Sequence, residues 1–214
     1  KKMIYLASSC CYPHGSPQPM KPEYLLSGRL EETNEAYAMA KLAGMKLCQA
    51  YRSQYGCNFI TAIPSTPFGP HSHFNPDEAH VIEGLMTRMH QAKLSSQKEV
   101  VIWGTGKPRR DFIYSADLAS ACAFLMNSYN DPAPINIGLN CDYSIAEVAE
   151  KIKAVTNFRG ALSFDTNRPD GMPLKRLDAS HIRTLGWKPA WTFEAGLAAT
   201  YDSYVNSAKP VNDG

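Results

Sequence analysis

A strand–helix–strand pattern near the start of the chain constrains the fold more than any other feature. Ile4–Ser8 is a short, continuous apolar run, which predicts a strand buried on both faces. A long helix is predicted over Glu35–Tyr55, with Gly56 as its stop signal. A second strand is predicted at Asn58–Ile63 and ends at Pro64. Elements in this order predict a parallel sheet with right-handed crossovers.

The alternation continues through the rest of the 214 residues. Ser144, followed three residues later by Glu147, predicts a capping box at the start of one helix. Further helices are predicted at about 79–94, 116–128, 145–155 and 193–205, and further strands at about 99–103, 135–137 and 161–164. The chain is therefore predicted to be α/β throughout.

Composition excludes several classes of partner. The 44% hydrophobic and 20% charged residues are ordinary for a globular protein, and the net charge of +2 indicates neither a nucleic-acid nor a membrane surface. No apolar run is long enough to span a bilayer. None of the six cysteines forms a CxxC pair, which favours a reducing, cytoplasmic compartment. His71 and His73 have no convincing third ligand, so no metal site is predicted. A buried strand that starts as early as residue 3 predicts a fragment, or a protein whose partner elements lie elsewhere.

Tyr37 and Lys41 carry the clearest chemical signal. They lie four residues apart in the long predicted helix, so their side chains share one face, about 5–6 Å apart at Cβ. A lysine ammonium that close favours the phenolate form of the tyrosine. If Ser8 reaches the same place, its hydroxyl can orient a substrate oxygen. Such a set suits proton transfer to or from a carbinol while a hydride moves to or from a nicotinamide. The alternative interpretation is a surface pair on a solvated helix.

An ordered set of motifs extends from about Ile4 to Tyr204 and identifies a family resemblance. The matching stretches include Ser8-Ser9-Cys10, Asn34-Glu35-Ala36-Tyr37-Ala38-Met39-Ala40-Lys41, Phe68-Gly69-Pro70, Trp103-Gly104-Thr105-Gly106, Pro108-Arg109-Arg110, Arg168-Pro169-Asp170-Gly171 and Leu185-Gly186-Trp187. On these residues the chain resembles the C-terminal two-thirds of the extended short-chain dehydrogenase/reductases, the NAD-dependent epimerase/dehydratase family. Within that family it is similar to the GDP-L-fucose synthases, which epimerise and reduce GDP-4-keto-6-deoxy-mannose.

The resemblance implies a fold in two parts. The first is the C-terminal half of a Rossmann-like parallel sheet, formed by residues 1–70 with 108–140 returning to it. The second is a smaller α/β domain that binds the nucleotide sugar, formed by 71–107 and 141–214. Family members commonly form homodimers through the helix that carries the tyrosine and lysine. An unpaired sheet edge at Ile4–Ser8 also predicts self-association.

The resemblance also implies roles for single residues. Ser8, Tyr37 and Lys41 match the reductase triad. Cys10 and His80 match the base and the acid of the two epimerisations, which need one group on each face of the inverted carbon. The residues implied to contact the cofactor, NADP, are Tyr37, Lys41 and His80. The residues implied to bind the GDP-sugar substrate are Arg88, Trp103, Arg110 and Lys175.

The chain also departs from the family pattern. Its one G-x-G, Gly104-Thr105-Gly106, leads to Pro108 rather than into a helix, so the family's glycine-rich phosphate loop is missing. Pro64–Phe68 lacks an asparagine and a tyrosine that the family usually carries, and Leu174 replaces an expected arginine beside Lys175.

These residues leave alternatives open. Cys10 could instead be a small buried apolar residue, and His80 a histidine at a helix start that bonds to the backbone. Arg109 and Arg110 could be a solvated pair, and Trp103 could be a packing residue. The predicted function is NADPH-dependent epimerisation and reduction of a GDP-4-keto-6-deoxy-hexose. The alternatives are a truncated, non-catalytic GDP-sugar-binding domain, and another nucleotide-sugar epimerase or dehydratase.

Overall fold

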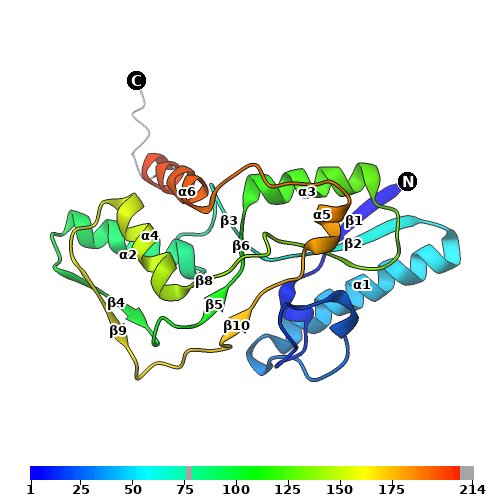
Figure 1. Cartoon of the computed structure of the whole chain (residues 1–214), viewed down its shortest axis with the longest axis horizontal. Coiled ribbons are helices and arrows are strands. Elements are labelled where there is room, and N and C mark those ends of the chain that lie inside the picture. Colours follow the sequence, from blue (N-terminus) through cyan, green and yellow to red (C-terminus); the bar gives the residue numbers. More distant parts are fainter. Residues whose placement is uncertain (76–78, 208–214) are drawn as a thin grey trace. The chain divides into compact units, whose positions relative to one another are not determined.

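The computed structural model describes residues 1–75 and 79–207, and the chain divides into two compact units. Unit 1 comprises Lys1–Pro67, Asp111–Asp142 and Leu174–Ala190. Unit 2 comprises Phe68–Arg110, Tyr143–Pro173 and the segment that begins at Trp191. The chain therefore passes between the units several times, as the colours of Figure 1 show.

Unit 1 is built on a three-stranded sheet in the order β1-β2-β7. The strands are β1 (Lys2–Leu6), β2 (Asn58–Pro64) and β7 (Ile135–Ile137). Both pairings are parallel, with Ile4 opposite Ile60 and Ala62 opposite Ile135. Helix α1 (Glu35–Tyr55) connects β1 to β2 and ends at Gly56, whose φ of 64° is left-handed. The parallel sheet expected from the strand–helix–strand pattern is confirmed.

Helices cover both faces of this sheet (Figure 1). On one face, Ile60 and Ala62 of β2 pack with Leu125 of α3 (Ser115–Ser128) and Ile182 of α5 (Ser180–Thr184). On the other face, Ile63 of β2 packs with the side of α1 that carries Met45. The alternation of β2 side chains between these two clusters explains why nearly the whole strand is apolar.

Three details of unit 1 correct the sequence expectations. Strand β1 ends at Leu6 and is only half-buried, because it pairs with β2 alone among the described strands. The proline after β2 does not end the strand: Pro64 belongs to β2, and β3 (Thr66–Phe68) pairs with β6 (Phe112–Tyr114). The segment Leu174–Ala190 was assigned to the second domain. It lies in unit 1 because Ile182 and Trp187 are buried in the unit 1 core.

Unit 2 contains a two-stranded parallel sheet with helices packed together beside it. Strands β4 (Glu99–Trp103) and β9 (Ala161–Asp165) pair with Val100 opposite Leu162. The helices are α2 (Val81–Leu94), α4 (Ile145–Thr156) and α6 (Phe193–Ser207). A short antiparallel pair joins β5 (Arg109–Arg110) to β8 (Tyr143–Ser144). Ser144 caps α4, and the capping box with Glu147 is present as predicted.

Several short elements were not expected from the sequence. They are the 3-10 turns η1 (Ser9–Cys11), η2 (Pro22–Tyr24) and η3 (Glu32–Asn34), strands β8 and β10 (Leu174–Lys175), and helix α5. Each is too short to give a periodic signal. In the part of the chain that the structure describes, no helix is both long and apolar enough to cross a membrane.

Candidate functional site

The turn η1 follows β1 and carries Cys10. Ser8 caps this turn, because its hydroxyl accepts the Cys10 N–H at 3.2 Å. The neighbouring Cys11 is buried, and its thiol donates to the Ala38 carbonyl of α1 at 3.8 Å. Burial raises the pKa of the Cys11 thiol. Cys10 is partly exposed, so it is the thiol of this pair that a reactant can reach.

Tyr37 and Lys41 lie on the first two turns of α1, the helix to which Cys11 is anchored. The Lys41 ammonium lies 5.8 Å from the centre of the Tyr37 ring and 5.5 Å from that of Tyr5. It also donates to the Leu6 carbonyl at the end of β1, at 3.0 Å. The Tyr37 ring is 50% exposed, and its hydroxyl has no hydrogen-bond partner among residues 1–75 and 79–207. Lys41 therefore joins the end of β1 to the tyrosine, whose hydroxyl stays open to a ligand.

Gly44 allows α1 to lie this close to the sheet. A Cβ atom at this position would collide with the hydroxyl end of the Tyr5 ring. The same ring lies beside the Lys41 ammonium. A glycine one turn after Lys41 therefore helps to set the position of the tyrosine–lysine pair.

Lys175 reaches Cys10 from the far end of the sequence. Its ammonium lies 3.4 Å from the Cys10 sulfur. The sequence placed Lys175 in a substrate-binding loop, with no indication of a contact to Cys10. The contact places a positive charge at hydrogen-bond distance from the partly exposed sulfur.

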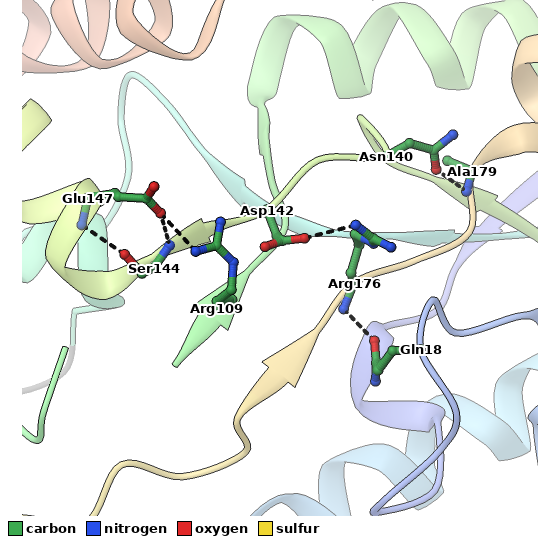
Figure 2. A network of polar contacts seen from close by, with 8 residues as sticks. All are labelled: Gln18, Arg109, Asn140, Asp142, Ser144, Glu147, Arg176 and Ala179. Atoms are coloured by element: carbon green, nitrogen blue, oxygen red, sulfur yellow. Dashed lines mark hydrogen bonds and ion pairs between the residues drawn. The ribbon is translucent and has the colours of Figure 1, made fainter. Parts of the chain in front are cut away.

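Backbone hydrogen bonds fix the segment that carries Lys175. The Met20 N–H donates to the Arg176 carbonyl at 2.8 Å, and the Asp178 N–H donates to the Met20 carbonyl at 2.9 Å. Side chains add two further contacts, drawn in Figure 2. The Arg176 N–H donates to Gln18 at 2.9 Å, and the Arg176 guanidinium forms an ion pair with Asp142 at 3.1 Å.

A buried tyrosine–asparagine pair supports the same segment. The Tyr12 hydroxyl donates to the Asn136 side chain of β7 at 2.6 Å. The Asn136 amide then donates to the carbonyls of Met20 and Asp178, at 2.9 and 3.0 Å. Burial raises the pKa of Tyr12, so its hydroxyl keeps its proton as a donor. The pair therefore connects β7, the loop after η1 and the segment of Lys175.

Unit 2 holds the other predicted residues. His80 is the N-cap residue of α2; its carbonyl accepts the Gly84 N–H at 2.8 Å. Its exposed imidazole makes no capping hydrogen bond to the described first turn. Arg88 lies two turns later and donates to the carbonyls of Gly84 and Val101, at 3.3 and 2.9 Å. Burial lowers the pKa of Arg88, which still remains far above neutrality.

Trp103 ends β4 and is 64% exposed, so the alternative of a packing residue is wrong for it. The guanidinium of Arg168 lies 5.0 Å from the centre of its ring. The Asp170 carboxylate accepts the Thr105 N–H at 2.6 Å and the Thr105 hydroxyl at 2.7 Å. These hydrogen bonds lower the pKa of Asp170. The family motif includes Asp170, but no sequence pattern indicates that its carboxylate holds the glycine-rich turn after Trp103.

The two adjacent arginines have different surroundings. Arg109 forms an ion pair with Glu147 of the α4 capping box, at 3.1 Å (Figure 2). Arg110 donates to the carbonyls of Arg109 and Met172, at 2.8 and 2.7 Å. Arg109 is therefore held by α4 at the surface, where its side chain is 42% exposed, and Arg110 is held by backbone carbonyls.

Within unit 1 the structure brings together Cys10 with Lys175, Ser8 with Cys10, and Tyr37 with Lys41. His80, Arg88, Trp103 and Arg110 all belong to unit 2. Among residues 1–75 and 79–207, no three side chains gather in a way that could hold a metal ion.

A family model described as the NAD dependent epimerase/dehydratase family matches residues 1–138. The chain is 46% identical over 207 residues to the "Probable GDP-L-fucose synthase 1" of Oryza sativa subsp. japonica, covering 97% of this chain and 63% of that protein. It is 40% identical over 215 residues to the GDP-L-fucose synthase of Escherichia coli (strain K12), covering 96% of this chain and 67% of that protein. The chain thus spans less than two thirds of the length of its rice relative.

Solved structures give the same picture. The GDP-L-fucose synthetase of Naegleria fowleri bound to NADP superposes with a TM-score of 0.92 at 32% identity, over 97% of this chain and 67% of that one. A GDP-6-OMe-4-keto-L-xylo-heptose reductase from C. jejuni also gives a TM-score of 0.92, at 33% identity, over 97% of this chain and 71% of that one.

Proposed function

Because the chain belongs to the NAD dependent epimerase/dehydratase family, we propose that it forms part of an enzyme that epimerises and then reduces a GDP-4-keto-6-deoxy-hexose. The relatives named GDP-L-fucose synthase, at up to 46% identity, support this choice of reaction. The single observation that carries it is the Lys41 ammonium held over the Tyr37 ring, on the helix that also anchors the turn of Cys10.

In the proposed epimerisation, Cys10 is the base and His80 is the acid. The Cys10 thiolate takes a proton from the carbon next to the ketone, and the electron pair of the broken C–H bond forms an enolate. His80 then gives a proton to the opposite face of that carbon, which inverts it. The Lys175 ammonium lies 3.4 Å from the sulfur and donates a hydrogen bond to it.

In the proposed reduction, the Tyr37 hydroxyl gives its proton to the ketone oxygen. NADP, when bound in its reduced form, supplies the hydride. The residues that would contact this cofactor are Tyr37, Lys41 and His80, and the open Tyr37 hydroxyl fits that role. The Lys41 ammonium, 5.8 Å from the centre of the ring, supplies positive charge where negative charge develops on the tyrosine. Ser8 would orient the same substrate oxygen.

We propose that four cationic or aromatic residues bind the GDP part of the substrate: Arg88, Trp103, Arg110 and Lys175. An arginine fork can bind two oxygens of a pyrophosphate at once. The exposed Trp103 ring offers a flat surface on which a base can stack.

We also propose that the protein acts in the cytoplasm, since all six of its cysteines are free. We further propose that it forms a homodimer through α1.

The test fuses this chain to the part of the rice relative that the match does not cover. With GDP-4-keto-6-deoxy-mannose, Tyr37→Phe is expected to slow NADPH oxidation by at least about 100-fold, since general acid catalysis contributes that much. The same variant should still exchange solvent deuterium into the sugar carbons beside the ketone. Cys10→Ser, in contrast, should lose the exchange of solvent deuterium into these carbons. Unchanged NADPH oxidation in Tyr37→Phe would refute the role of the tyrosine.

The alternative of a GDP-sugar-binding domain without catalysis predicts a different outcome. GDP binding with no NADPH binding, and no activity in the fusion, would favour this alternative.

A further inference from the structure

Asp111 is a buried carboxyl that the proposed reaction does not use. It lies directly before β6 in unit 1 and is 2% exposed. Neither of its carboxyl oxygens has a well-formed hydrogen bond in the part of the chain that the structure describes. Burial raises the pKa of Asp111 to about 7. Such a group is far more stable in a protein interior as the neutral acid than as an unpaired anion.

Three segments of unit 1 meet at this residue. The Asp111 N–H donates to the Lys175 carbonyl, and the Asp111 carbonyl accepts the Thr66 N–H, both at 3.2 Å. On the third side, a Cβ atom at Gly138 would lie 2.7 Å from the Asp111 carboxyl, so any larger residue there would force the carboxyl to shift. The donors nearest to the carboxyl are the N–H groups of Leu139 and Leu177 and the hydroxyl of Ser65. The Ser65 hydroxyl is itself buried without a well-formed hydrogen bond to any described residue.

We propose that Asp111 is a positioning residue: as a neutral carboxyl it holds the segment Leu174–Asp178 against unit 1 and so keeps Lys175 beside Cys10. The Asp111 backbone N–H bonds to the Lys175 carbonyl, and the Asp111 carboxyl lies beside the Leu177 N–H. The Lys175 ammonium contacts Cys10, so the contacts are continuous. The catalytic meaning of this contact rests on the proposed function, whereas the proton-dependent packing does not.

No cation is placed to compensate an ionised Asp111 among the described charges around it. Arg176 pairs with Asp142, and Lys175 lies on the Cys10 sulfur. Asp142 is a carboxylate and further disfavours a charge on Asp111. Asp178 is itself acidic and accepts hydrogen bonds from Ser180, so it cannot balance a negative charge on Asp111. Loss of the proton therefore leaves a buried anion with no cation beside it, and the N–H groups of Leu139 and Leu177 and the Ser65 hydroxyl offset only part of the cost of burial.

The sign of the pH dependence follows from the two pKa values of Asp111. The ordinary value is 3.8, and the packed state has a pKa of about 7, so the packed state keeps its proton over a range in which an opened state loses it. Opening of the segment is therefore hardest at about pH 4 and becomes easier up to about pH 7. The full effect is about tenfold in the opening equilibrium per pH unit. Above about pH 7 both states are ionised and the dependence ends.

Hydrogen–deuterium exchange of the whole 214-residue chain, followed by mass spectrometry between pH 5 and pH 8.5, tests the proposal. After correction for intrinsic exchange rates, amides of Leu174–Asp178 should open up to about tenfold more per pH unit below pH 7, then level off. Asp111→Asn should show a nearly flat profile. Asp202→Asn, which changes an exposed carboxylate of α6, is the matched control and should behave like the wild type. A wild-type profile without the rise, or an Asp111→Asn profile that retains it, would overturn the proposal.

The rate at which iodoacetamide alkylates Cys10 provides a second readout. The wild-type rate relative to that of Asp111→Asn should change over the same pH range as the exchange. If the variant does not fold, the wild-type exchange profile of Leu174–Asp178, with amides of α6 as the internal reference, still decides the matter. Neither measurement needs substrate or cofactor. A failure of GDP binding would therefore refute the proposed function and leave the role of Asp111 standing.

Discussion

The contact between Lys175 and Cys10 joins two residues that are 165 positions apart in the chain. It exists because Met20 pairs with the segment around Leu177, and because the Tyr12–Asn136 pair secures both. No local pattern in the sequence predicts such a contact. The motif resemblance named both residues but assigned one to chemistry and the other to substrate binding. We infer from their proximity that Lys175 also raises the reactivity of Cys10, a role beyond substrate binding.

Replacing this lysine tests that role. Lys175→Met keeps most of the side-chain length but removes the ammonium, so Cys10 should be alkylated by iodoacetamide several-fold more slowly at pH 7. Peptide mapping by mass spectrometry separates Cys10 from the other cysteines. Lys98→Met, at an exposed position in unit 2, should leave the rate unchanged. An equal rate in Lys175→Met and the wild type would show that the ammonium does not activate the thiol.

Helix α1 shows how far a sequence can predict a single element. Its limits at Glu35 and Tyr55, and its stop at Gly56, follow from helix periodicity and a left-handed C-terminal glycine. Its tight contact with Tyr5 through Gly44 does not follow from periodicity, because the ring belongs to another element. For strand β1 the sequence pattern predicted the wrong degree of burial. Its apolar residues suggested burial on both faces, yet Met3 and Leu6 are more than one third exposed at the sheet edge.

An exposed apolar stripe runs along α1. Leu47, Tyr51 and Tyr55 are 44–62% exposed and lie at intervals of four residues, so they share one face; Met39, 54% exposed, lies about two turns before Leu47. A stripe of this kind typically packs against a partner. Leu47→Lys should therefore weaken self-association by at least about tenfold, because it places a charge at the centre of the interface.

Sedimentation velocity at several protein concentrations measures the effect of Leu47→Lys. The matched control is Leu94→Lys, at the exposed end of α2, which should sediment like the wild type. A wild-type chain that remains monomeric at all concentrations would contradict a dimer through α1. A dimer that Leu47→Lys leaves intact would instead point to the edge of β1.

At the scale of the whole molecule, the α/β class and most of the longer elements could be predicted from the sequence. The division into units could be predicted only in part, because Leu174–Ala190 returns to unit 1 through buried contacts of Ile182 and Trp187. The site, too, could be predicted from the sequence only in part. Tyr37 with Lys41 could be predicted from helix geometry, whereas the links of Asp111 and Lys175 depend on which segments meet in the folded unit.

The central proposal for the whole molecule is that this chain carries the residues that bind a GDP-sugar. Calorimetric titration of the 214-residue chain with GDP, and separately with NADPH, tests this claim most directly. We expect saturable GDP binding that Arg88→Met weakens by about tenfold or more, as the loss of a charged hydrogen bond predicts, while Arg159→Met, at an exposed position, has no effect. NADPH binding would add that the chain also holds its cofactor. The absence of any heat with GDP, or equal GDP binding by the wild type and Arg88→Met, would contradict the account.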